Sequence, residues 1–155
     1  MKVDKRIFIK TAESFSIAGK GALGPWRRST EVWSSKQYFP EQLKNLFKTH
    51  IPKVEIGAGA GALFDELRII RWNDDFPEAL KAKLLIVGTA PNGDHIVVDL
   101  KTGATGYMSH EHDWQSDPRE FFIAVSDSLG NFLRDINSNP SRVPDDYWDA
   151  RSGRN

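Results

Sequence analysis

The segment LLIVGTAPNGDHIVVDLKTGATGYMS, residues 84–109, decides which fold the chain adopts. It contains three short runs rich in apolar and β-branched residues, which favour strands: Leu84–Val87, His95–Leu100 and Thr105–Ser109. Asn92-Gly93 lies between the first two runs and suits the positive φ angles of a tight hairpin. The sequence KTG separates the second run from the third. Because tight turns join antiparallel strands, the segment predicts a three-stranded antiparallel meander.

Two helices are expected, one before this meander in the sequence and one after it. The first begins at Pro40, because proline is tolerated at the first helical position, and it ends before Pro52. The second follows an expected strand at Phe121–Val125, and Ser126 or Asp127 would cap its first turn. The apolar stripes of the two helices are Phe39, Leu43, Leu46, Phe47 and Ile51, and Leu129, Phe132, Leu133 and Ile136.

Two further segments predict strands. Ile7, Ile9 and Thr11 alternate with polar residues, as in a half-buried strand, and Leu67–Trp72 is an apolar, β-prone run. Residues 73–83 predict a loop that leads into a short helix. The chain is expected to form a single domain over residues 1–155.

The composition excludes several classes of protein. The chain has 155 residues, 39% hydrophobic and 27% charged, with 21 basic and 21 acidic residues and a net charge of +0. This balance argues against a nucleic-acid partner, which normally selects a basic face. The absence of cysteine excludes disulfides and thiol catalysis and fits a cytoplasmic protein. No apolar run approaches the ~20 residues of a membrane span, so no membrane partner is expected.

The segment VEIGAGAGALF, residues 54–64, resembles the nucleotide loop of a methyltransferase through Gly57, Gly59 and Gly61. Such a loop requires a helix that begins directly after the glycines and then a parallel strand. The following residues fit that arrangement poorly, because tight turns join the later strands. A nucleotide-cofactor enzyme at Gly57–Gly61 is therefore an alternative, and a small-residue strand or loop is the favoured interpretation.

The segment SHEHDW, residues 109–114, is the densest polar cluster. His110 and His112 would share one face of an extended strand and could bind a metal ion together. Further ligands would come from Glu111, Asp113, His95 or Asp99. A metal-dependent enzyme at His110 and His112 is a second alternative, and a solvated loop with one or two structural hydrogen bonds is the favoured interpretation.

An ordered series of motifs, the motif series, runs through the second half of the chain. Its members are Val87-Gly88, Gly93-Asp94, Val98-Asp99, Gly106, His110-Glu111 and Ala124–Ser128 followed by Leu129. The series resembles the SMI1/KNR4 family of the SUKH superfamily, with Leu129 where the family usually has phenylalanine. The family usually opens with a tryptophan-rich helix and a helix start of the form leucine-proline-x-x-(tyrosine or phenylalanine). YFPEQLKNLF, from Tyr38, is similar to that helix start, whereas residues 1–35 do not align.

The resemblance implies an α+β fold with a mainly antiparallel mixed sheet and helices packed around it. It implies no catalytic activity and no cofactor, so we interpret the motif residues as structural: Asn92, Gly93, Asp94, Asp99, Gly106, His110 and Glu111. Many members of the family are bacterial immunity proteins that bind and neutralise a toxin, often a nuclease or a deaminase, and fungal members act in cell-wall regulation. A cytoplasmic immunity protein that binds a cognate toxin is the expected function.

Two segments that combine tryptophan with acids are candidates for the partner-binding surface. Both are expected in loops beside strands, and their candidate residues are Trp72, Asp74, Asp75, Trp114 and Asp117. An exposed tryptophan is a common interface anchor, and acidic neighbours would attract the basic cleft of a nuclease. The alternative is that both tryptophans belong to the core.

Overall fold

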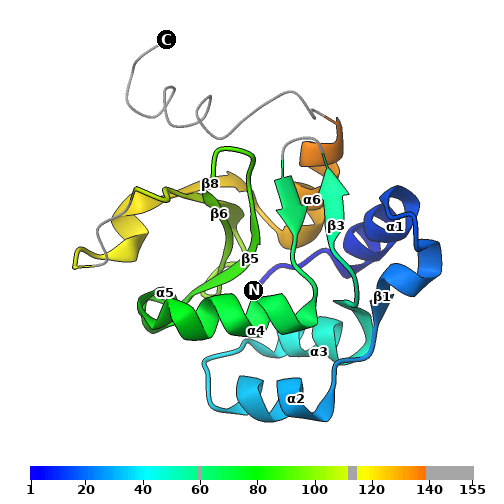
Figure 1. Cartoon of the computed structure of the whole chain (residues 1–155), viewed down its shortest axis with the longest axis horizontal. Helices are drawn as coiled ribbons and strands as arrows, with labels where there is room; N and C mark the ends of the chain where they lie inside the picture. The colour runs from blue at the N-terminus through cyan, green and yellow to red at the C-terminus, as the bar shows by residue number, and fades with distance from the viewer. Residues whose placement is uncertain (59–60, 112–114, 139–155) are drawn as a thin grey trace.

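A six-stranded antiparallel sheet forms the centre of the computed structural model, which describes residues 1–58, 61–111 and 115–138 (Figure 1). Each strand pairs with the next one along the chain. The strands are β3 (Ile56–Ala58), β4 (Gly61–Leu63), β5 (Leu84–Thr89), β6 (His95–Asp99), β7 (Thr105–Met108) and β8 (Phe122–Ser126). The predicted α+β fold with a mainly antiparallel sheet is confirmed, and every described pair of strands is antiparallel.

The central meander consists of β5, β6 and β7, as residues 84–109 predict. Leu85 pairs with Val98, and Ile96 pairs with Tyr107. Gly93 has a φ of 94° in the turn between β5 and β6, and its amide donates to the Ala90 carbonyl at 2.9 Å. A residue with a side chain would be strained at this φ, which explains the glycine.

Helices cover both faces of the sheet. The described helices are α1 (Lys5–Phe15), α2 (Arg28–Ser35), α3 (Glu41–His50), α4 (Glu66–Asp75), α5 (Pro77–Lys81) and α6 (Leu129–Ser138). Two short 3₁₀ helices, η1 (Gly19–Ala22) and η2 (Pro118–Phe121), and a two-stranded sheet of β1 (Leu23–Gly24) and β2 (Ile51–Pro52) complete the structure. His95 contacts Trp72 of α4, whereas Tyr107, paired with Ile96, contacts Phe132 of α6. Since neighbouring residues of a strand point to opposite faces, α4 and α6 lie on opposite sides of the sheet.

One continuous apolar core joins the sheet to both helical layers. Phe8 of α1 and Phe132 of α6 are fully buried on one side, and Leu43 of α3 and Ile69 of α4 are buried elsewhere in the same cluster. None of the described helices has both the length and the apolar character that crossing a bilayer requires.

Two strand predictions are wrong, because both segments are helical. Residues 7–11 lie in α1, which buries Phe8, Thr11 and Ala12 at helical spacing. Residues 67–72 lie in α4, which also includes residues 73–75 of the predicted loop. The Asp65 side chain caps α4 by accepting from the Arg68 amide at 3.0 Å.

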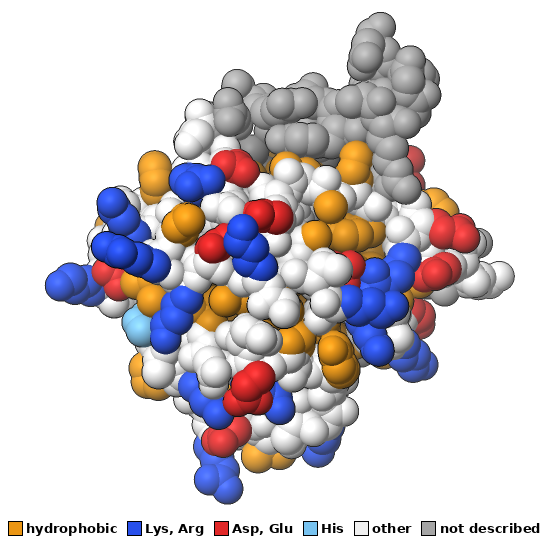
Figure 2. Space-filling view, turned by 180° about the vertical axis from the view of Figure 1, so that it is seen from behind, with side chains coloured by type: hydrophobic (Ala, Val, Ile, Leu, Met, Phe, Trp, Pro, Cys, Tyr) orange, Lys and Arg blue, Asp and Glu red, His pale blue; other side chains and the backbone are white. Residues whose placement is uncertain are grey.

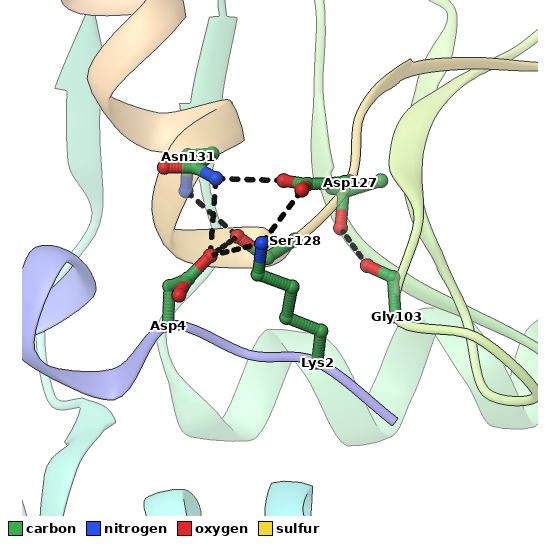
Figure 3. Close-up of polar contacts among 7 residues, drawn as sticks. Lys2, Asp4, Gly103, Asp127, Ser128 and Asn131 are labelled. Carbon is green, nitrogen blue, oxygen red and sulfur yellow. Dashed lines mark hydrogen bonds and ion pairs between the residues drawn. The ribbon is translucent and has the colours of Figure 1, made fainter.

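The start of α6 also differs from the prediction, although β8 and the helix itself lie where expected. Ser128 caps the helix in place of Ser126 or Asp127, since its hydroxyl accepts from the Asn131 amide at 3.1 Å. The Ser128 hydroxyl in turn donates to Asp4 at 2.7 Å, so the cap also holds the N-terminal segment (Figure 3). Lys2 extends the tie through its ion pair with Asp127 at 2.8 Å. These contacts fix α1 beside α6.

Candidate partner-binding surface

The sequence predicted that Trp72 lies in an exposed loop, and this prediction is wrong. Trp72 lies in the last turns of α4. Its ring is half-buried and stacks between Phe64 and Phe76, with centroid distances of 5.2 and 5.6 Å. His95 of β6 meets the indole edge at 5.4 Å. Trp72 therefore packs against the core and holds α4 on the sheet, which agrees with the alternative interpretation of this residue.

The acidic candidates are exposed. Asp74 and Asp75 project from the end of α4, and Asp74 accepts from the Trp33 ring nitrogen of α2 at 2.9 Å. Asp117 caps η2, because its carboxylate accepts from the Arg119 amide at 3.0 Å. Trp114 lies outside the described residues.

Two adjacent hollows beside α5 bring Asp74 and Asp117 onto one surface. A hollow of about 490 Å³ contains Asp117, a second of about 240 Å³ contains Asp74, and Lys81 of α5 lines both. We name this area the α5 surface: Tyr38, Asp74, Glu78, Lys81, Lys83, Lys101, Asp117 and Arg119. Sequence spacing could not reveal this surface, since its residues come from four separate segments.

Arg119 fixes the shape of the larger hollow. Its guanidinium donates to both oxygens of Asp99 at 3.0 and 2.9 Å, and its Nε donates to the Ala82 carbonyl at the end of α5 at 2.8 Å. Burial alone would raise the pKa of Asp99, but the hydrogen bonds from Arg119 and the Lys101 amide hold that pKa below its usual value. The bidentate pair therefore locks η2, which carries Asp117, against β6 and α5.

The α5 surface is not predominantly acidic. Lys81, Lys83 and Lys101 line the larger hollow together with Arg119, against the two carboxylates Glu78 and Asp117. Figure 2, which turns the molecule by 180°, shows basic side chains gathered on its right, the side on which α5 lies. The Lys83 ammonium lies 4.7 Å from the centre of the ring of Tyr38, a residue that is 52% exposed. The surface thus offers an exposed aromatic ring among charges of both signs.

Most of the remaining motif residues occupy turns and strand ends. Asp94 is buried, and it accepts from the backbone amide of His110 at 3.0 Å and contacts the ring Nδ1 of His110 at 2.6 Å. The Asn92 side chain holds the other oxygen of Asp94 at 3.1 Å. Glu111 is exposed, and its amide donates to the Ser109 hydroxyl at 3.2 Å. The His110–Asp94 contact ties the end of β7 to the β5–β6 turn, which is the arrangement that a structural role for His110 requires.

The two alternative enzyme sites have the following geometry. Among the described residues, no group of three or more metal-binding side chains is placed to hold an ion, and His112 and Asp113 lie outside them. Gly57 of β3 pairs with Ala62, and Gly61 of β4 pairs with Ala58, in the antiparallel β3–β4 hairpin, whereas Gly59 lies outside the described residues. A hairpin is a different arrangement from the strand, loop and helix of a nucleotide loop.

Glu66, at the start of α4, is a buried carboxylate that the sequence reasoning missed. Its oxygens accept from Lys53 Nζ at 2.7 Å and from the Arg27 amide at 2.6 Å. Burial raises the pKa of Glu66, but these hydrogen bonds outweigh burial and keep it below its usual value. The three residues are far apart in the sequence, so no local motif marks them.

No family model matches the chain, and no curated protein matches its sequence.

Proposed function

We propose that this chain is a protein-binding module of the SMI1/KNR4 type, and that it acts as an immunity protein that binds and neutralises a cognate toxin. One observation carries the proposal. The motif series falls, in order, on the meander strands β5 to β7 and the turns beside them, then on β8 and on the start of α6. Its glycines and acids occupy turns, strand ends and close backbone contacts, which are the positions that an ordered structural series would require.

The α5 surface supports binding of a protein. Arg119 and Asp99 fix its larger hollow before any partner arrives, so little conformational entropy would be lost on association. Tyr38 supplies an exposed aromatic ring, a side chain that is enriched at interfaces. Asp74 and Asp117 of this surface, and Asp75 next to Asp74 in the sequence, remain candidate contacts, and the lysines of the surface add charges of the opposite sign.

A co-expression experiment tests this function. The product of the gene next to this one would be produced in bacteria alone and together with this chain. We expect that product to arrest growth, the chain to restore growth, and the two proteins to elute as one complex in gel filtration. The immunity proposal is wrong if the chain neither restores growth nor forms a complex.

Matched variants locate the contact. Tyr38→Ala and Lys81→Glu should each weaken the complex about tenfold without lowering the melting temperature. Lys48→Glu, an exposed residue of α3, is the control and should bind as the wild type does. Equal binding by all three variants would place the interface elsewhere.

A further inference from the structure

A second surface, formed by α1 and the adjoining flank of α6, has properties that neither the core nor the α5 surface explains. Two hollows of about 530 and 330 Å³ lie along it, and Lys10 lines both. We name it the α1 face: Lys5, Arg6, Ile9, Lys10, Phe15 and Arg134. All except Arg134 come from α1.

The α1 face exposes large apolar side chains. Phe15, at the end of α1, is 55% exposed, and Ile17, which follows α1 two residues later and lines neither hollow, is fully exposed at 108%. Ile7 and Ile9 are half-buried and line the two hollows. Exposed apolar groups that adjoin one another are typical of interaction sites, whereas single ones are ordinary.

The charge of this face is one-sided. Its two hollows contain four cationic side chains and one acid, Glu13, although the whole chain has a net charge of +0. Asp135 lies 3.7 Å from Arg134 and offsets part of that cation. Figure 2 shows basic side chains beside apolar ones on its left, the side on which α1 lies. A partner for this face would therefore need negative charge.

The face is also held rigid from behind. Asp4, directly before α1, accepts from the Ser128 hydroxyl at 2.7 Å and from the Asn131 side chain at 3.0 Å, both at the start of α6 (Figure 3). The Gly130 amide donates to the Val3 carbonyl at 3.1 Å. These bonds fix the two helices that flank the smaller hollow, so the apolar and cationic groups keep their relative positions.

We propose that the α1 face binds an acidic protein surface, one whose carboxylates surround apolar side chains that enter the two hollows. The proposal rests on the proposed function only in taking the partner to be a protein. A second copy of the chain fits poorly, because two faces of like charge repel each other. The paired hollows suit protruding side chains of a protein better than the even surface of a lipid bilayer.

A binding experiment with a defined probe tests the proposal. The probe is a fluorescein-labelled peptide of glutamates interrupted by leucines, and a peptide with lysines in place of the glutamates is its control. Fluorescence anisotropy should show that the full chain binds only the acidic peptide, more weakly as salt rises. Arg6→Glu/Lys10→Glu should weaken that binding about tenfold, and Ile17→Ser should weaken it without any change in charge.

The matched control is Lys81→Glu/Lys101→Glu, which makes the same change of charge on the α5 surface. If both double variants lose the peptide equally, binding reflects net charge and the inference is overturned. It is also overturned if phosphatidylserine vesicles, but not the peptide, bind through Ile17, or if the chain dimerises and Phe15→Ser abolishes the dimer.

The neighbouring gene product separates this inference from the proposed function. If the α5 variants abolish neutralisation while the α1 variants bind and neutralise normally, the immunity function holds and the α1 face is not its interface. If the α1 variants alone abolish neutralisation, the acidic partner is the toxin itself.

Discussion

Two buried carboxylates connect parts of the chain that are distant in sequence. Asp99 of β6 accepts hydrogen bonds from the Arg119 guanidinium. Glu66 of α4 accepts hydrogen bonds from the Lys53 ammonium and from the Arg27 amide. The side chains of Asp99 and Glu66 are only 12% and 3% exposed. A carboxylate at such depth depends on its partners, because the loss of one leaves an uncompensated charge away from water.

Replacement of Arg119 is the first prediction. Arg119→Met removes the cation but retains most of the side-chain volume, so Asp99 is left buried without its partner. We expect the free energy of unfolding to fall by about 3 kcal/mol, as measured by urea denaturation. The control is Arg68→Met, since both Arg68 and Glu55 are more than half exposed in their ion pair, and it should change stability by less than about 1 kcal/mol. Equal losses in the two variants would contradict the role of burial.

The second prediction concerns pH. The folded chain lowers the pKa of Glu66 and of Asp99 below the ordinary values. A carboxyl of lowered pKa stabilises the fold above its unfolded pKa, near 4.3 for Glu, and that stability is lost as pH falls through the lower folded pKa. The free energy of unfolding should therefore fall with acid below about pH 4. Glu66→Gln should make this fall shallower, and an unchanged slope would exclude Glu66 as a contributor.

At the scale of the element, the meander was predictable and two helices were not. Residues 84–109 contain two turn sequences that are typical of tight hairpins, and the strands beside these turns lie where expected. Residues 67–72 are β-prone, with two adjacent isoleucines, and the helix depends on a local signal just before this run, the Asp65 cap. In residues 7–11 apolar and polar residues alternate as in a strand, but packing of this segment against α6 stabilises a helix instead.

The third prediction concerns the packing of neighbouring strands, and it compares substitutions at two separate glycines. A Cβ on Gly106 of β7 would collide with the Ile123 carbonyl of β8, so Gly106→Ala must push the two strands apart. We expect a loss of about 1–3 kcal/mol by urea denaturation. Gly57→Ala on β3 is the control, because nothing lies within 4 Å of its Cβ position, and its stability should change by less than about 1 kcal/mol. If Gly106→Ala left the stability unchanged, the prediction would be wrong, and β8 would be able to move away from β7 at no cost.

At the scale of the whole molecule, the candidate surfaces arise from contacts that sequence patterns cannot indicate. Asp74 and Asp117 are acids beside tryptophans in two distant segments, and Lys81, which is close in sequence to Asp74 but far from Asp117, joins them on the α5 surface. Trp72 was recognisable as important, but its place against the core depends on Phe64 and His95. Sequence reasoning could therefore name candidate residues, whereas the sign of the charge around them required the fold.

The last prediction concerns the cooperativity of the whole fold. The apolar core is continuous from Phe8 to Ile136, and the Asp4 contacts bind the first residues to α6. A single core of this kind should unfold in one transition, with far-UV circular dichroism and tryptophan fluorescence changing together.

Asp4→Ala leaves the buried Ser128 hydroxyl without its acceptor and should lower stability by about 2 kcal/mol. Both optical signals should shift to the same lower urea concentration, because α1 and α6 share the core with the α4 layer that contains Trp72. Lys5→Ala, at the exposed start of α1, is the control and should leave the midpoint unchanged. Two separate transitions in Asp4→Ala, with fluorescence retained after helicity is lost, would show that the α1 and α6 layer unfolds independently of the sheet and its other helices.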